Sequence, residues 1–346
     1  MRSPLSKIED YPAYLEKCWL EHLQERSYDA PTVISLFAGC GGSSLGYSMA
    51  GFRELLAVEW DDNAVETFKL NFPDVPVYHG DITKLSVGEV FKMTGLERYK
   101  LDVLDGSPPC QGFSTAGKRI LDDPRNQLFR EFVRLLDGLQ PKVFVMENVS
   151  GMVKGKMKLV FAEILRELKG CGYQVSARLL NAMYFGVPQS RQRVIFIGVR
   201  DDLGIKPSHP EAENVPIKAK EAIKGLDNSG IYLFPTKQRV SWWELCPAGD
   251  NFSKIHPKGH WFNQQKASPK KPFPTITKSV FVNGGAGVSH WDIPGQLSIE
   301  MVKRASSYPN VFRLIGKYTE QWARVGNSVP PLFMRSIAKH IRFNIL

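Results

Sequence analysis

Short apolar runs alternate with longer helical patterns along much of this chain. Residues 33–37 form an apolar run of buried-strand length, which is followed by the glycine-rich segment 38–42 and a helical pattern over 43–51. Strands that alternate with helices predict an α/β fold with a doubly wound, mostly parallel sheet. The further predicted strands are 54–59, 75–78, 101–105, 143–146 and 193–199, with helices at 126–139 and 156–170.

The pattern changes three times along the chain. Residues 1–30 carry apolar side chains at helical spacing and predict a helical extension, and residues 31–200 hold the strand-helix alternation. Residues 201–290 are rich in Pro, Lys, Trp and Asn and have no strong period. They predict a second, smaller domain or a long insertion, because a structureless loop of this length is improbable. Helical spacing returns over 291–346, where a final helix is predicted at 330–345.

The composition is that of a folded, basic protein. The 346 residues are 43% apolar and 23% charged, which suits a sizeable core. The formal net charge of +10 favours a polyanion as partner, although many soluble proteins are as basic. No apolar run approaches the roughly 18 residues of a membrane span, and the first residues lack an apolar signal core. We therefore expect no membrane segment.

The cysteines do not form a recognisable framework. Their number is odd, they lie far apart, and none belongs to a Cys-x-x-Cys pair. This pattern favours neither disulfides nor a zinc site, and it is typical of a reducing compartment. We therefore expect no bound metal. The cysteines are Cys18, Cys40, Cys110, Cys171 and Cys246.

The segment 37–42 lies where the first strand gives way to a helix, so its glycines allow the backbone to approach a ligand closely. Glu59 follows Gly39 by 20 residues, at the end of the second predicted strand. An acid at that place bonds the ribose of an adenosine-containing cofactor. The spacing is not Gly-x-Gly-x-x-Gly, which favours S-adenosylmethionine over NAD; taken alone, it also fits a plain tight turn. Trp60 either stacks on the adenine or belongs to the core, and Asp81 would accept from the adenine amino group.

A cysteine after two prolines is the strongest chemical signal. Pro108-Pro109-Cys110-Gln111 follows a predicted strand, and the prolines restrict the backbone so that the thiol is held in one geometry. Proteins of this type that methylate amino groups carry an aromatic residue in place of the cysteine, because an amino nitrogen attacks a methyl sulfonium unaided. A cysteine therefore predicts covalent activation of a ring carbon. A lone Pro-Cys is more often a turn with a buried thiol, and the surrounding motifs argue against that interpretation here.

Two charged clusters follow later strands. Glu147 comes after a predicted strand, so it emerges at the same sheet edge as Cys110, where ligands gather in open α/β sheets. The segment 189–193 begins the next predicted strand and contributes Arg191 and Arg193. An acid at a strand end and a pair of arginines are each usually solvated surface. Their order after Cys110 indicates a site.

Taken in order, these motifs resemble those of the DNA cytosine-5 methyltransferase family, from about residue 32 to residue 339. The resemblance implies the class I S-adenosylmethionine-dependent methyltransferase fold, of the bacterial modification-enzyme type. It implies a catalytic domain at 31–200, a target-recognition domain at 201–290 and a C-terminal segment, 291–346, that returns to the catalytic domain. The matching segments are 37–42 (FAGCGG), Glu59 with Trp60, 80–82 (GDI), 106–114 (GSPPCQGFS), 147–149 (ENV), 189–193 (QSRQR) and 326–331 (GNSVPP).

The resemblance also implies roles for single residues. Cys110 would add to C6 of a flipped-out cytosine, which makes C5 nucleophilic toward the cofactor methyl group. Glu147, protonated or sharing a proton with N3, would bond N3 and the N4 amino group, while Arg191 and Arg193 would favour the thiolate or hold the base O2 or a phosphate. The implied cofactor residues are Phe37, Gly39, Gly41, Gly42, Glu59, Trp60, Asp81, Ile82 and Asn327.

Double-stranded DNA is the implied partner. In the segment 274–277 (PTIT), Thr277 is favoured over Thr275 as the residue that touches the backbone of the flipped nucleotide. One departure from the family pattern is Gly295-Gln296, which stands where the helix before the closing motif usually opens with an arginine. It bears on target choice or local stability. The other implied DNA contacts are Gln111, Ser114, Lys118 and Arg119.

Three functions follow from this resemblance. A DNA methyltransferase is favoured, because catalytic and recognition segments fill the chain. The tRNA-methylating branch of the fold typically carries Cys-Phe-Thr in the recognition region, and this chain does not. An inactive relative tends to lose the nucleophile or the glutamate, and both are present. We expect a monomer that acts in the bacterial cytoplasm, at the nucleoid through its DNA binding. A cognate restriction endonuclease that acts separately is a candidate partner.

Overall fold

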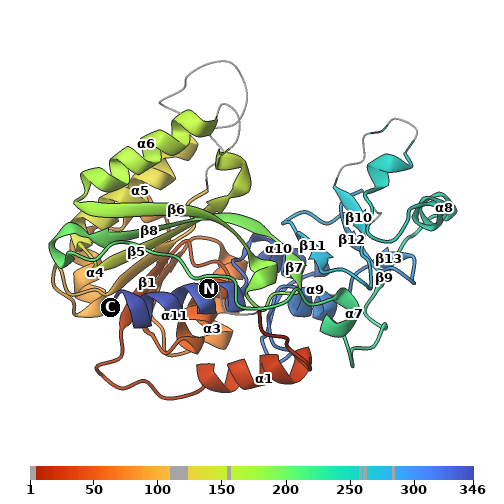
Figure 1. The fold of residues 1–346 in the computed structure, drawn as a ribbon, viewed down its shortest axis with the longest axis horizontal. Helices are drawn as coiled ribbons and strands as arrows, with labels where there is room; N and C mark the ends of the chain where they lie inside the picture. The colour runs from red at the N-terminus through yellow and green to blue at the C-terminus, as the bar shows by residue number, and fades with distance from the viewer. Residues whose placement is uncertain (1–4, 110–123, 154–156, 257–258, 260–262, 283–284) are drawn as a thin grey trace. The chain divides into compact units, whose positions relative to one another are not determined.

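The computed structural model divides the chain into two compact units, each assembled from separate stretches (Figure 1). The seven-stranded unit comprises Gln24–Leu180, Gln192–Glu211 and Met334–Leu346, and the small-sheet unit comprises Met1–Leu23, Asn181–Arg191 and Ala212–Phe333. Their limits differ from the predicted limits at residues 30, 200 and 290, whose functional assignment stays a prediction. No helix in the described ranges is long and apolar enough to cross a membrane. These ranges are 5–109, 124–153, 157–256, 259, 263–282 and 285–346.

One large sheet organises the seven-stranded unit. Among the described residues its strand order is β3-β2-β1-β4-β5-β8-β6. The pairs β1–β2, β1–β4, β2–β3 and β4–β5 are parallel, and β8 runs antiparallel to β5. The predicted α/β fold with a mostly parallel sheet is therefore confirmed. The strands are β1 (Thr32–Leu36), β2 (Arg53–Glu59), β3 (Val77–His79), β4 (Val103–Gly106), β5 (Val143–Val149), β6 (Tyr173–Asn181) and β8 (Gln192–Arg200).

Helices cover both faces of this sheet, with α5 and α6 over one face and α3 and α11 over the other (Figure 1). Buried side chains of α4, α5 and α6, such as Val90, Phe132 and Ile164, join Leu36 and Phe144 of the sheet in one apolar core. The helices are α2 (Gly42–Met49), α3 (Asp62–Asn71), α4 (Val87–Thr94), α5 (Pro124–Leu139), α6 (Met157–Gly170) and α11 (Pro331–Asn344), with 3-10 turns at Ile82–Lys84, Ser150–Val153 and Asp201–Leu203.

The end of the chain is tied to the loop after α2. Arg342 Nη1 on α11 donates to the Ala50 carbonyl oxygen at 2.8 Å. The same nitrogen lies 1.9 Å from where a Cβ on Gly51 would stand, and Gly51 has φ +83°. Position 51 therefore favours glycine because of its left-handed backbone, and an added Cβ would also displace the end of the Arg342 side chain.

The sequence pattern missed strand β6. Tyr173 and Leu180 are buried near its two ends, but most residues between them are half-buried or exposed. β6 stands last in the strand order, so only one of its edges pairs within the sheet. An outer strand of this kind lacks the continuous apolar run that marks the central strands.

The small-sheet unit is built from short elements. Within its described residues it contains a four-stranded sheet in the order β10-β12-β13-β9 and a separate parallel pair, β11–β7. Helix α1 (Tyr11–His22) agrees with the predicted helical extension. The strands are β7 (Gln189–Ser190), β9 (Tyr232–Leu233), β10 (Gln264–Lys266), β11 (Phe273–Pro274), β12 (Gly287–Ser289) and β13 (Gly295–Gln296). The other helices are α7 (Ala219–Ala222), α8 (Lys237–Leu245), α9 (Ile299–Ala305) and α10 (Tyr318–Asn327), with 3-10 turns at Ala182–Tyr184 and Phe252–Lys254.

Gln296 holds the four-stranded sheet together. Its buried Nε2 donates to Gln264 Oε1 at 2.7 Å and to the Ala286 carbonyl oxygen at 2.9 Å, and Gln264 Nε2 donates back to Gln296 Oε1 at 3.1 Å. A Cβ on the preceding Gly295 would lie 2.7 Å from the Tyr232 carbonyl oxygen. Gly295 and Gln296, the two residues that depart from the family pattern, therefore stabilise this sheet.

Gly198 illustrates how tightly the central strands pack. It pairs with Phe144 across β5 and β8, and a Cβ at position 198 would lie 1.9 Å from Phe144 Cε1. The Phe144 ring in turn contacts Phe132 and Tyr173 edge-on, at centroid distances of 6.0 and 5.3 Å. Rings packed in this way on several sides have little room to move.

We predict that Gly198→Ala lowers the free energy of unfolding by about 1–3 kcal/mol, because the added methyl group overpacks the core. Gly88→Ala is the matched control, since no atom lies within 4 Å of its added Cβ and the site is exposed on α4. The control should change stability by less than about 1 kcal/mol, in the stabilising direction. Urea denaturation followed by circular dichroism measures both changes. Equal stability of Gly198→Ala and wild type would contradict the prediction.

Candidate active site

The predicted site residues fall into three groups. One group lies in the seven-stranded unit, a second lies in the small-sheet unit, and the third lies outside the described residues. The first group is Phe37, Gly39, Gly41, Gly42, Glu59, Trp60, Asp81, Ile82, Glu147 and Arg193. The second is Arg191, Thr277 and Asn327, and the third is Cys110, Gln111, Ser114, Lys118 and Arg119.

The glycine loop after β1 has a left-handed backbone at several positions. Phe37 and Gly39 both have φ of 57°, and Gly41 has φ of 92°. A Cβ on Gly41 would lie 2.4 Å from the Phe72 ring, so position 41 requires glycine for its space as well as its backbone. A Cβ on Gly39 would meet no atom within 4 Å. The loop is therefore packed at Gly41 and open at Gly39.

Glu59, the last residue of β2, fixes this loop. Its Oε2 accepts from the Gly39 N–H at 2.8 Å, and its Oε1 accepts from the N–H groups of Trp60 at 2.9 Å and Asp61 at 3.0 Å. The residue is only 8% exposed. A carboxylate has about four acceptor sites, so three such bonds leave capacity for a further donor. Glu59 thus links the loops after β1 and β2 and can still bind a hydroxyl group.

The residues after Glu59 differ in exposure. Trp60 is 75% exposed, so the interpretation that its ring belongs to the core is wrong. Asp81 is exposed and caps the turn Ile82–Lys84, where its Oδ1 accepts from the Thr83 N–H at 2.9 Å. This hydrogen bond lowers the pKa of Asp81, which is therefore ionised at neutral pH. Ile82 is buried in the apolar core.

Glu147 and Arg193 form an ion pair across β5 and β8. In the antiparallel register Glu147 faces Ile195, so Arg193, two residues earlier on β8, is its diagonal neighbour on the same sheet face. Arg193 Nε lies 2.7 Å from Glu147 Oε1, and the two side chains are only 14% and 11% exposed. The structure therefore brings together two of the four residues predicted to be catalytic.

Asn148 lies next to Glu147 and was not predicted as a site residue from the sequence. Its buried Nδ2 donates to the Pro108 carbonyl oxygen at 3.2 Å, and its Oδ1 accepts from the Val149 N–H at 2.8 Å. Asn148 thus holds the chain two residues before Cys110. Its place beside Glu147 in the 147–149 motif was the available signal.

Two buried acids lie under helix α2. Tyr47 hydroxyl donates weakly to Asp105 Oδ1 at 3.4 Å, and Ser44 Oγ donates to Glu54 Oε1 at 2.9 Å. Burial, together with the negative charges of Glu54 and Glu147, raises the pKa of Asp105 to about 8, although hydrogen bonds from Ser43 and Tyr47 act in the opposite direction. Burial likewise raises the pKa of Glu54 to about 7. Neither acid could be predicted as buried from the sequence, because their burial depends on the sheet register.

Arg191 and Gln189 are buried in the small-sheet unit. The Arg191 guanidinium donates to the carbonyl oxygens of Ile276 at 2.8 Å, Gly326 at 3.2 Å and Ser328 at 3.0 Å. Gln189 Nε2 donates to Ser306 Oγ at 2.9 Å. The predicted catalytic role of Arg191 stays a prediction, and these contacts are those of a residue that holds backbone segments together.

The two candidate threonines differ in their contacts. Thr275 Oγ1 donates to the Ser190 carbonyl oxygen at 2.7 Å. Thr277 is exposed, and its backbone carbonyl oxygen accepts from Trp322 Nε1 at 3.0 Å. Asn327, the last residue of α10, is also exposed. The preference for Thr277 over Thr275 as a ligand contact therefore agrees with its exposure.

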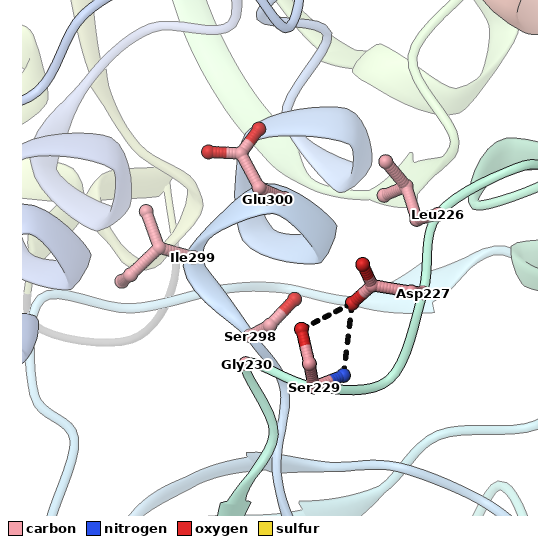
Figure 2. Close-up of a pocket in the computed structure, with 7 residues that line it drawn as sticks. All are labelled: Leu226, Asp227, Ser229, Gly230, Ser298, Ile299 and Glu300. Carbon is pink, nitrogen blue, oxygen red and sulfur yellow. Dashed lines mark hydrogen bonds between the residues drawn. The ribbon is translucent and has the colours of Figure 1, made fainter.

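A pocket of about 310 Å³ in the small-sheet unit contains none of the predicted site residues (Figure 2). Asp227 and Glu300 lie on its walls, where Asp227 Oδ1 accepts from the N–H and hydroxyl groups of Ser229. Ser298 caps α9 by accepting from the Met301 N–H at 3.2 Å. The polar groups of Asp227 and Ser298 thus stabilise the local turns.

Comparison with known proteins identifies the family. The family model described as "C-5 cytosine-specific DNA methylase" matches residues 31–342. The chain therefore belongs to this family of enzymes that methylate cytosine in DNA. It is 36% identical to the type II methyltransferase M1.HphI of Haemophilus parahaemolyticus over 328 residues, which cover 90% of this chain and 86% of the relative. It is 32% identical to M.DdeI of Desulfomicrobium norvegicum, over 89% and 88% of the two chains.

A solved structure supports the same fold. A prophage-encoded candidate DNA modification methyltransferase (E. coli) aligns with a TM-score of 0.75 and 24% identity, over 90% of this chain and 99% of its own. At that identity the likeness concerns the fold alone. Together with the family match, it confirms the resemblance drawn from the motifs and the predicted class I methyltransferase fold.

The buried acids make stability depend on pH. In the unfolded chain both carboxyls ionise near pH 4, whereas in the folded protein Asp105 and Glu54 ionise near pH 8 and 7. The folded state therefore holds protons that the unfolded state has lost, and the free energy of unfolding falls as pH rises from about 4 to about 8.

We predict that Asp105→Asn reduces the fall in the free energy of unfolding that wild type shows as pH rises. The stability of the variant relative to wild type should rise by on the order of 1–3 kcal/mol between about pH 5 and pH 8, measured as the difference in unfolding free energy at each pH. Glu97→Gln, which changes an exposed carboxyl of the same unit, is the control and should show no such trend. A constant difference between Asp105→Asn and wild type across this range would mean that Asp105 is ionised throughout.

Proposed function

We propose that this enzyme uses Cys110 to methylate C5 of a flipped-out cytosine in a specific double-stranded DNA sequence, with S-adenosylmethionine as the methyl donor. The observation that supports this most directly is the Glu147–Arg193 ion pair at 2.7 Å, next to Asn148, which holds the Pro108 carbonyl. Cys110 itself lies outside the described residues, so its role rests on the family motif.

The residues after β1 and β2 fit an adenosine-containing cofactor. Glu59 is oriented by three backbone N–H groups, Gly39 borders open space, and the Trp60 ring is exposed. S-adenosylmethionine, when bound, supplies an electrophilic methyl group on a sulfonium. We assign Glu59 to the ribose hydroxyls, Trp60 to the adenine ring and Asp81 to its amino group. The other proposed cofactor residues are Phe37, Gly39, Gly41, Gly42, Ile82 and Asn327.

The proposed reaction places one task on each catalytic residue. The Cys110 thiolate adds to C6 of the cytosine, which places electron density on C5. A free thiol has a pKa near 8.5, so only a small fraction is thiolate at neutral pH, and a nearby arginine would increase that fraction. Glu147, protonated or sharing a proton with N3, bonds N3 and accepts from the N4 amino group of the base, while Arg193 holds the Glu147 carboxyl in place. Once C5 carries the methyl group, loss of the C5 proton and elimination of the thiol restore the aromatic ring.

We further propose that residues 201–290 recognise the DNA sequence. This segment presents basic and aromatic side chains together, since the Arg239 guanidinium lies 5.0 Å from the Trp242 ring centroid and the His256 ring meets Trp242 edge-on at 5.4 Å. Such groups suit phosphates and base edges. Thr277, Gln111, Ser114, Lys118 and Arg119 are the other proposed DNA contacts.

The biological setting follows from the relatives. M1.HphI and M.DdeI are type II methyltransferases, which supports a role in a restriction-modification system. We propose that this enzyme acts as a monomer and protects its recognition sequence from a separate cognate endonuclease.

We predict that Cys110→Ala abolishes methyl transfer and leaves cofactor binding intact, because the thiol forms the covalent bond to C6. DNA that carries 5-fluorocytosine in the target sequence should form a covalent adduct with wild type, since the fluorine cannot leave as a proton. Denaturing gel electrophoresis and transfer of a labelled methyl group measure the two effects.

Cys171→Ala is the control, because Cys171 is a free cysteine of the same unit that donates to a backbone carbonyl at 3.5 Å. It should form the adduct as wild type does. Near wild-type methylation by Cys110→Ala would rule out the proposed nucleophile.

We predict that Glu59→Ala weakens S-adenosylmethionine binding by about 1.5–3 kcal/mol, the usual contribution of a hydrogen bond to a charged group. Glu66→Ala, an exposed acid on α3, should bind the cofactor as wild type does. Calorimetric titration measures both affinities, and DNA affinity without cofactor should change little. An unchanged cofactor affinity in Glu59→Ala would place the ribose contact elsewhere.

A further inference from the structure

Gln189 and Arg191 point to the same side of one extended segment. In an extended chain, side chains two residues apart share a face. Gln189 is 0% exposed and Arg191 is 3% exposed, whereas Ser190 and Gln192 between and after them are exposed. The two buried side chains can therefore contact the same segment of the chain on that face.

The backbone that packs there is the turn 274–277. Ile276 N–H donates to Gln189 Oε1 at 3.1 Å, and the Ile276 carbonyl oxygen accepts from Arg191 Nη1 at 2.8 Å. The strand pair β7–β11 and the bond from Thr275 Oγ1 to the Ser190 carbonyl, at 2.7 Å, continue the same attachment. Both backbone polar groups of Ile276 are thus held by side chains of one short segment.

The second guanidinium nitrogen of Arg191 reaches a different turn. Its Nη2 donates to the carbonyl oxygens of Gly326 at 3.2 Å and Ser328 at 3.0 Å. The planar guanidinium presents its donors in a fixed fork, so one side chain can bind two backbone segments at once. A lysine, with a single ammonium group on a flexible stem, cannot hold both segments in this way.

The two turns also contact each other directly. A Cβ on Gly326 would lie 2.3 Å from the Thr277 carbonyl oxygen, so the turns approach as closely as a glycine allows. The Thr277 carbonyl oxygen accepts from Trp322 Nε1 of α10 at 3.0 Å. Because α10 ends at Asn327, one rigid element supports both turns.

We infer that Arg191 is a positioning residue that couples DNA binding to cofactor binding. The inference rests on the proposed function, in which Thr277 contacts the DNA backbone and Asn327 contacts the cofactor. Thr277 directly follows Ile276, and Asn327 lies between Gly326 and Ser328, so each contact residue adjoins a carbonyl held by the same guanidinium. Cofactor at Asn327 and DNA at Thr277 then favour the same arrangement of the two turns.

Such coupling is reciprocal: each ligand raises the affinity of the other by the same factor. For wild type we expect S-adenosylhomocysteine, the unreactive product of the cofactor, to tighten DNA binding by about 5- to 150-fold. Arg191→Lys should bring this factor close to one, because the lysine can bind one turn but not both. A loss of folded protein alone would lower the active fraction and leave the factor unchanged.

The experiment measures two dissociation constants for each variant. The probe is a short duplex containing the sequence that bisulfite sequencing of wild-type-treated DNA identifies, and its affinity is determined by fluorescence anisotropy with and without saturating S-adenosylhomocysteine. Arg304→Lys is the matched control. Arg304 is another buried arginine of the same unit, 6% exposed, whose guanidinium donates to Asn310 Oδ1 at 2.7 Å and to the Ala222 carbonyl oxygen at 3.3 Å. This control should keep the wild-type factor.

Trp322→Phe provides a second test that leaves Arg191 in place. It keeps most of the ring but removes the donor to the Thr277 carbonyl, so it should reduce the coupling factor while leaving cofactor affinity without DNA near that of wild type. If Arg191→Lys does not fold, this variant decides the question.

The possible outcomes separate the two proposals. A wild-type protein that methylates no DNA would contradict the proposed function. A wild type that methylates DNA but binds it equally with and without S-adenosylhomocysteine would overturn only the coupling. An unchanged coupling factor in Arg191→Lys would also overturn the coupling. If that variant kept the coupling factor and lost only its catalytic rate, Arg191 would be a catalytic residue.

Discussion

The antiparallel pairing of β8 with β5 is the constraint on which the site depends. Its register sets Arg193 diagonally opposite Glu147 and thereby makes the 2.7 Å ion pair. It also makes Asn148 the neighbour of Val194, on the strand that carries the motif 189–193 into the sheet. A shift of one residue would turn Arg193 to the other sheet face and leave the Glu147 carboxyl without this partner.

The motif 189–193, which leads into β8, is divided between the two units. Gln189 and Arg191 belong to the small-sheet unit, and Arg193 belongs to the seven-stranded unit. The first two residues hold backbone carbonyl and N–H groups, whereas the third holds a carboxylate. Three side chains at alternate positions of one motif therefore perform two kinds of task, which explains why the motif contains two arginines that are not equivalent.

The sequence was sufficient where a feature is local. The apolar run at β1, the glycine loop after it and the acid at the end of β2 could be predicted because each depends on neighbouring residues. The contacts of Arg191 could not, since Ile276 is 85 residues away along the chain. Asp105 and Glu54 were missed for a related reason: their raised pKa values arise from burial beneath α2, which follows from strand pairing. Cys110 is predicted by its motif, and it lies outside the described residues.

The bond between Arg342 and Ala50 has a consequence for synthesis on the ribosome. The seven-stranded unit cannot be completed when residue 180 or 211 has emerged, because its last part is Met334–Leu346. Domains usually fold one after another as the chain leaves the ribosome. Here most of the small-sheet unit is translated before the last part of the seven-stranded unit. The Ala50 carbonyl in the loop after α2 can therefore bind Arg342 only after 292 further residues have been synthesised. Contacts at such separation slow folding, which gives chaperones a longer interval in which to bind the incomplete sheet.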